Sequence, residues 1–185
     1  MPYPAQVQAI ELTEKARELI ESEGLDRLTL ASLAAAFGIA APSLYHHFKN
    51  KTALLVAVNE RTGALLVEHV QASIAQTDDP RERISVMLHA YRVFALANPS
   101  TYGLAFTNTI PDLQLDPTFA EALALPLQAT VAELVGTEVA LPALRGGWAL
   151  VHGFVMLELS GQFRRGGDLD AAFAHAVETY IRGLA

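Results

Sequence analysis

The chain has 185 residues, of which 51% are hydrophobic and 18% charged, and its formal net charge at pH 7 is −7. This length supports a buried core in one or two small domains, and the composition excludes a disordered chain. The sequence has no cysteine, which excludes disulfide scaffolds and thiolate metal sites and fits a reducing cytoplasm. The acidic balance argues against a protein that coats nucleic acid without specificity.

No basic segment followed by an apolar run marks a signal peptide at the start of the sequence. The most apolar stretch, GGWALVHGFVMLELSG, is interrupted by His152 and Glu158 and is short for a bilayer span. We therefore expect a soluble, cytoplasmic protein with no membrane partner.

Three short helices are expected before residue 50. Apolar residues recur at helical spacing from Val7 to Ile20, and Gly24 follows as a stop signal. Thr29 is a typical N-cap for the next helix, which Gly38 ends. The expected helices span residues 7–24, 30–37 and 42–48.

The rest of the chain is also expected to be helical. Pro126 should kink or split the helix that contains it. No strand alternation and no internal repeat is visible, so the predicted fold class is all-α, with a domain boundary in the fourth helix that separates residues 1–56 from residues 57–185. The expected helices span residues 51–76, 81–97, 101–108, 117–135, 142–161 and 168–184.

A local gap in acidic charge marks the N-terminal part of this acidic chain. From Arg27 to Arg61 the only acidic residue is Glu60, and the same window contains Lys49 and Lys51. A local basic patch suits a small, specific nucleic-acid contact. The alternative is an accidental absence of acids in an alanine-rich segment.

The same window has the pattern of a helix-turn-helix, in which two short helices pack across a glycine turn and the second enters the major groove. Gly38 and Ile39 supply the turn, and Leu44 and Phe48, four residues apart, would hold the second helix against the core. Five residues would then be directed outward to varying degrees: Ala41, Ser43, Tyr45, His46 and His47.

The stretch LTLASLAAAFGIAAPSLYHHFKNKTALL, residues 28–55, resembles the TetR/AcrR family of transcriptional regulators. A second stretch, GGWALVHGF with Trp148, His152 and Gly153, resembles the WHG-type C-terminal domain of TetR-like regulators. The first resemblance rests on these matching positions: Leu28-Thr29, Leu33-Ala34, Gly38-Ile39, Ser43-Leu44-Tyr45, His47-Phe48, Asn50-Lys51 and Leu54-Leu55.

The resemblance implies a set of DNA-binding residues. Tyr45, His47 and Lys51 would bind phosphates, while Ala40 and Ala41 are too small to hydrogen-bond a base, so DNA shape would carry more of the specificity. The alternative for the two histidines is that they are solvated side chains with no partner. The implied set is Thr29, Ala41, Pro42, Ser43, Tyr45, His46, His47 and Lys51.

The resemblance also implies that the C-terminal bundle forms a homodimer through its last two helices and binds a small-molecule effector. Residues 148–159 are apolar on nearly every side, which predicts burial on every side. Within this run Glu158 is costly unless it is paired, and the alternative is a salt bridge at the rim of the interface. The alternative for the effector residues is that they are ordinary core, with His152 bonded to a backbone carbonyl. The candidate effector lining is Tyr91, Phe94, Tyr102, Phe106, Trp148, His152 and Met156.

The predicted function is that of a ligand-responsive repressor, which binds a palindromic operator in double-stranded DNA as a dimer and is released by a small apolar effector. The alternative is a helical protein-interaction module without specific DNA binding. No phosphate-binding loop, G-x-S-x-G turn or H-E-x-x-H pair is present, and adjacent His46 and His47 would point about 100° apart on a helix. We therefore expect no catalytic residue, no cofactor and no metal.

Overall fold

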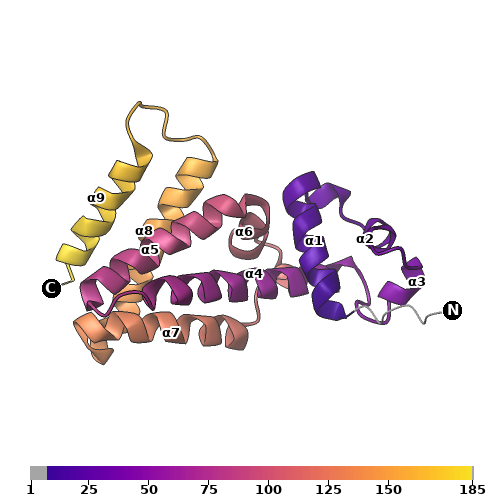
Figure 1. Cartoon of the computed structure of the whole chain (residues 1–185), viewed down its shortest axis with the longest axis horizontal. Coiled ribbons are helices and arrows are strands. Elements are labelled where there is room, and N and C mark those ends of the chain that lie inside the picture. The colour runs from indigo at the N-terminus through magenta and orange to yellow at the C-terminus, as the bar shows by residue number, and fades with distance from the viewer. Residues whose placement is uncertain (1–7, 185) are drawn as a thin grey trace. The chain divides into compact units, whose positions relative to one another are not determined.

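The computed structural model describes residues 8–184, and every helix or strand assignment in that range is helical, which confirms the all-α fold class (Figure 1). The chain divides into two compact units. The N-terminal unit contains Met1–Gly63 and Asn98–Asp116, and the C-terminal unit contains Ala64–Ala97 and Pro117–Ala185. The division into functional domains at residues 1–56 and 57–185 stays a prediction.

The N-terminal unit is built from short helices, and Val7, predicted to begin the first of them, lies outside the described residues. The two 3-10 turns η1 and η2 were not predicted, because a three-residue turn carries no hydrophobic period. The helix predicted at residues 42–48 ends at Leu44 and continues as hydrogen-bonded turns to Phe48. The elements are α1 (Ala9–Glu23), η1 (Leu25–Arg27), α2 (Leu30–Ala36), α3 (Ala41–Leu44), the first part of α4 (Lys51–Ile74), α6 (Pro99–Phe106) and η2 (Pro111–Leu113).

The core of the N-terminal unit joins segments that are far apart in the sequence. Buried apolar residues come from every helix between α1 and α4, and Leu104 and Leu113 from the segment 98–116 complete the same cluster. The fully buried members from the first four helices are Leu12, Ala16, Ile20, Leu33, Leu44, Leu54 and Val58.

The C-terminal unit packs its helices around α5, which contacts α7, α8 and α9. The helices α7 and α8 pack against each other, and α8 and α9 run as a hairpin joined by an exposed loop (Figure 1). The elements are the end of α4, α5 (Pro80–Ala97), α7 (Pro117–Val135), α8 (Thr137–Leu159) and α9 (Leu169–Arg182).

Two prolines lie inside helices of this unit. The expected split at Pro126 is wrong, because α7 continues through it, and the Thr130 hydroxyl donates to the Pro126 carbonyl at 3.2 Å. The helix α8 begins at Thr137, five residues before the predicted start, and includes Pro142. A proline inside a helix costs about 3 kcal/mol, and the neighbours of Pro142 on α8, Ala140 and Leu144, are buried.

Two adjacent glycines allow α9 to approach α8 closely. A Cβ on Gly146 or Gly147 would lie 3.2 or 3.3 Å from the ring of Tyr180. The Tyr180 hydroxyl donates to the carbonyl of Ala143. Burial raises the pKa of this phenol, although a backbone hydrogen bond at Gly147 acts in the opposite direction. The pair of glycines therefore fixes the position of the C-terminal helix on α8.

By length and composition alone, α7 and α8 are long and apolar enough to cross a membrane. This is weak evidence, because core helices of soluble proteins pass the same test. Both helices pack against α5 in the C-terminal unit.

Candidate nucleic-acid interface and ligand-binding residues

The first helix of the predicted helix-turn-helix starts with a reciprocal capping box. The Ser32 amide donates to the Thr29 hydroxyl, and the Thr29 amide donates to the Ser32 hydroxyl, both at 2.9 Å. This arrangement satisfies two amides that a helix start otherwise leaves free. The predicted cap at Thr29 is confirmed, while its partner Ser32 was missed.

The turn between α2 and α3 depends on Gly38. Its φ of 63° lies in the left-handed region, which glycine adopts at little cost. The Ile39 amide then donates back to the carbonyl of Ala34 at 3.1 Å, which closes the end of α2. The sequence Gly38-Ile39 therefore sets the direction in which the chain enters α3.

The segment that follows has an apolar underside and a polar outer face. Leu44 is fully buried and Phe48 is 6% exposed, so these two residues anchor the segment as predicted. Tyr45 is 58% exposed although it lies next to a buried leucine. The predicted DNA-binding residues of this segment are exposed or, for Ala41, partly exposed: Ala41, Pro42, Ser43, Tyr45, His46 and His47.

The last residue of the predicted set, Lys51, begins α4 and is partly buried. Its ammonium donates to the carbonyl of Leu25 in η1 at 3.3 Å, which ties the two elements together. An ammonium has three N–H donors, so two remain for other acceptors such as phosphate oxygens. Next to it, the Asn50 side chain accepts from the Ala53 amide at 2.8 Å and supports the start of α4.

The chemistry of this face suits an anionic partner. Tyr45, His46 and His47 bring O–H and N–H groups to an exposed surface, and the exposed Lys49 adds a positive charge. Groups of this kind make most protein contacts to DNA phosphates and sugars. The DNA-binding role of each residue stays a prediction.

The segment 98–116 is anchored to α1 by charged and polar contacts that sequence reasoning missed. The Glu21 carboxylate accepts from the amides of Ser100 and Thr101, at 3.0 and 2.7 Å, and so caps the start of α6. Arg17 donates to the Asn98 side chain at 3.1 Å. No periodicity in the sequence links these positions, which lie about 80 residues apart.

Arg17 also belongs to an ion-pair group with Glu14 and Arg61. The Glu14 carboxylate accepts from Arg17 at 3.1 Å and from Arg61. Partial burial acts to raise the pKa of Glu14, but the hydrogen bonds from Arg61 and Arg17 outweigh it and hold that pKa below its ordinary value. This group connects α1 to α4.

The predicted effector residues fall in both units. Tyr102 and Phe106 lie in the N-terminal unit, with ring centroids 5.1 Å apart. In the C-terminal unit Tyr91 and Phe94 are buried, His152 and Met156 are partly buried, and Trp148 is 45% exposed. The role of the seven residues as an effector lining stays a prediction.

The imidazole of His152 gives the C-terminal unit a pH-dependent element. Burial lowers the pKa of His152 below its ordinary value of 6.5, because the charged form is desolvated.

We expect the free energy of unfolding to fall as the pH is lowered below 6.5, because the unfolded chain then binds a proton that the folded imidazole resists. The loss should continue until the pH passes the lower pKa of the folded state. Urea unfolding of wild type and His152→Gln at pH 7.5 and 5.5 measures it. The free energy of unfolding should change less between the two pH values in His152→Gln than in wild type. An equal change in both proteins would show that His152 is not the titrating group.

A buried arginine, also missed from the sequence, joins three helices of the C-terminal unit. Arg92 of α5 is 7% exposed and binds both carboxylate oxygens of Glu158, at 2.8 and 2.7 Å. It also pairs with Asp170 of α9 at 2.7 Å. Its guanidinium lies 5.5 and 5.1 Å from the ring centroids of Phe154 and Phe173. Glu158, which was expected to need a partner, is thus paired with Arg92 inside the C-terminal unit.

Within residues 8–184, no group of three or more histidine, aspartate or glutamate side chains is arranged to hold a metal ion. The polar clusters of this part of the chain are instead ion pairs and helix caps.

Two family models match the chain. Residues 12–58 match the model for bacterial regulatory proteins of the tetR family, and residues 84–180 match a tetracyclin repressor-like C-terminal domain. The HTH-type transcriptional regulator Rv0681 of Mycobacterium tuberculosis is 31% identical over 188 residues, which cover 98% of this chain and 83% of that protein.

Solved structures show the same fold. A protein of unknown function from Rhodococcus sp. RHA1 aligns with a TM-score of 0.81 at 24% identity, over 100% of this chain and 99% of that chain. A singly substituted TetR from Acinetobacter baumannii AYE, solved in complex with minocycline, aligns with a TM-score of 0.68 at 26% identity over 96% of both chains. The resemblance noted in the sequence is confirmed, and the chain belongs to the TetR family of DNA-binding transcriptional regulators.

Proposed function

We propose that this regulator is a repressor that binds a palindromic operator in double-stranded DNA as a homodimer and is released by a small apolar effector. The observation that carries the proposal is the set of exposed side chains Ser43, Tyr45, His46 and His47, on a segment that the buried Leu44 and Phe48 anchor to the core. A recognition helix needs this combination, because its inner face must hold it rigid while its outer face meets the groove. An interaction module without DNA specificity has no need of it.

Within this proposal the side chains divide into two groups. Tyr45, His47 and Lys51 bind phosphates and set the register, while His46 lies beside a base or the sugar. Ala41, Pro42 and Ser43 approach the base edges, where alanine offers only a methyl contact. Thr29 binds a phosphate at the start of α2 while its hydroxyl caps the helix.

We expect Tyr45→Ala to weaken operator binding by about tenfold, the effect of losing one hydrogen bond of roughly 1.4 kcal/mol. Fluorescence anisotropy with DNA from upstream of the chain's own gene, compared with shuffled DNA at the same salt concentration, measures it. Val93→Ala is the matched control, because Val93 on α5 is 56% exposed and Tyr45 is 58% exposed.

The operator affinity of Val93→Ala should equal that of wild type, and both variants should melt at the wild-type temperature. If wild type bound shuffled and upstream DNA equally at matched salt, sequence-specific regulation through this site would be refuted.

The proposed dimer interface uses an exposed apolar stripe on α8. Leu141, Trp148 and Leu159 are spaced by seven and eleven residues, so they share one face of the helix, and all three are exposed. An exposed apolar face of this kind favours a second copy as partner. Val155 and Phe173 are fully buried inside the C-terminal unit, so they belong to its core.

The proposed effector binds in the C-terminal part of the chain. The relative from Acinetobacter baumannii was solved with minocycline, which supports a small-molecule ligand for this chain. Such a ligand releases the operator only if it binds the DNA-incompetent state more tightly. A thermal-shift screen of apolar compounds, with hits tested for operator release, identifies it. Hits that stabilise wild type and a folded His152→Ala variant equally would place the site elsewhere. As a soluble DNA-binding regulator, the protein is proposed to act in the cytoplasm.

A further inference from the structure

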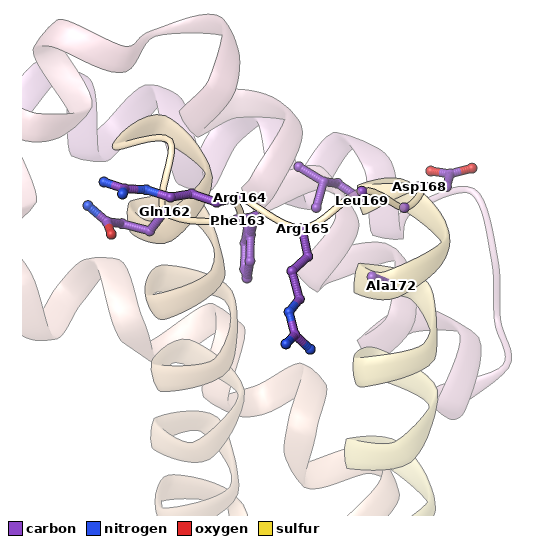
Figure 2. Close-up of a pocket in the computed structure, with 9 residues that line it drawn as sticks. Gln162, Phe163, Arg164, Arg165, Asp168, Leu169 and Ala172 are labelled. Carbon is purple, nitrogen blue, oxygen red and sulfur yellow. The ribbon is translucent and has the colours of Figure 1, made fainter.

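The loop between α8 and α9 borders a pocket of about 330 Å³ (Figure 2). The side chains of Phe163 and Arg165 extend from the loop in the same direction, into the space between the two helices, while Arg164 is directed away from it. The lining residues are Gln162, Phe163, Arg164, Arg165, Gly166, Gly167, Asp168, Leu169 and Ala172.

The two acids near this pocket have partners other than Arg165. The Asp168 carboxylate accepts from the amides of Asp170 and Ala171, at 2.9 and 3.2 Å, and caps α9. The Asp170 carboxylate pairs with Arg92 at 2.7 Å. Among the described residues Arg165 has no ion-pair partner, so its guanidinium brings an unneutralised positive charge to the pocket.

The remaining wall of the pocket is apolar and well supported. Phe163 packs on Phe154 with ring centroids 4.8 Å apart, and Phe154 packs on the buried Phe173 at 5.0 Å. Leu169 and Ala172 of α9 add aliphatic surface. The guanidinium of Arg165 thus lies beside an apolar wall that tilted and edge-on contacts between Phe163, Phe154 and Phe173 support.

We propose that this pocket binds a small amphiphilic carboxylate, whose charged end pairs with Arg165 and whose apolar body lies against Phe163 and Leu169. A planar guanidinium matches a carboxylate with two parallel hydrogen bonds. One inward-directed cation favours a monoanion over a doubly charged phosphate. The pocket is open to solvent, and its volume of about 330 Å³, at the lower end of the roughly 300–1,000 Å³ of small-molecule sites, suits a short chain or a single ring.

This site shares no residue with the predicted effector lining or with the DNA-binding face. The proposal therefore does not depend on the proposed repressor function, and direct binding measurements on the full chain test it without DNA.

The experiment compares hexanoate and benzoate with hexanamide, the neutral analogue of hexanoate, by ligand-observed NMR and calorimetry. Wild type and Arg145→Gln, which removes an exposed arginine of α8 outside the pocket lining, should bind both carboxylates with the same affinity. Arg165→Gln should bind them about tenfold more weakly, the effect of one lost charge-assisted contact, and Arg165→Lys should lie between the two. Hexanamide should bind wild type as weakly as hexanoate binds Arg165→Gln.

Three outcomes would overturn the proposal. The first is the absence of saturable carboxylate binding up to about 10 mM. The second is an equal loss of affinity in Arg145→Gln and Arg165→Gln, which would indicate general attraction to positive charge on this unit. The third is equal binding of hexanoate and hexanamide, which would leave the guanidinium without a role.

Discussion

Replacing Arg92 with methionine is expected to lower the free energy of unfolding by about 3–5 kcal/mol, the cost of removing one partner from a buried ion pair. Glu158 would keep its charge in a site where its side chain is 17% exposed, with no cation left to neutralise it. The guanidinium contacts to Phe154 and Phe173 would be lost as well. Urea unfolding followed by circular dichroism measures the change.

Two further variants separate the buried pair from the exposed one. Asp170→Asn should cost less than about 1 kcal/mol, because the Asp170 side chain is 85% exposed and its charge is screened by solvent. The double variant Arg92→Met, Glu158→Leu should recover most of the stability lost in Arg92→Met, because apolar pairs replace buried ion pairs at little cost. If the double variant were less stable than Arg92→Met alone, the buried charge of Glu158 would not be the cause.

This ion pair also shows what the sequence can and cannot predict. The apolar surroundings of Glu158 indicated that it needs a partner, because an unpaired buried carboxylate is unstable. Its partner could not be identified, because Arg92 lies 66 residues away on another helix and looks like an ordinary basic position of α5. Pairing between distant helices follows from tertiary packing, which a local pattern does not record.

Helix boundaries could be predicted where a local residue sets them, and could not where tertiary packing does. Capping residues and glycines fixed the limits of α2, where Thr29 and Gly38 act within one or two turns. The predicted start of α8 at Pro142 is wrong, although proline is typical of a first helical turn. Gly136, with a φ of 81°, is the break between α7 and α8. The helix α8 continues through Pro142, which lies in its second turn.

The two candidate sites differ in how far they could be predicted. Most of the DNA-binding face lies in residues 41–47. Because Leu44 and Phe48, four residues apart, are buried, the exposure of Tyr45 and His47 between them could be predicted. The effector residues come from helices far apart in the sequence. Trp148 and His152 are four residues apart and therefore share one face of α8. No spacing shows whether a face is directed into the bundle or outward, and Trp148 is 45% exposed.

The exposure of Trp148 leads to the prediction about assembly. Wild type should sediment as two 19.9 kDa chains at micromolar concentration. Trp148→Glu places a charge in the centre of the proposed interface in both copies, and each desolvated charge costs several kcal/mol. The dimer dissociation constant should therefore rise by at least about hundredfold, and the variant should sediment as one chain.

Leu125→Glu on α7 is the matched control, because Leu125 is 55% exposed and Trp148 is 45% exposed, and both lie in the C-terminal unit. This variant should remain a dimer. Operator affinity should fall in Trp148→Glu alone, because a single chain reads one half-site where a dimer reads two. Both variants should keep the helical content of wild type, since neither side chain is part of the core. A dimeric Trp148→Glu beside a monomeric Leu125→Glu would move the interface from α8 to α7, and a wild type that sediments as one chain would refute the proposed homodimer.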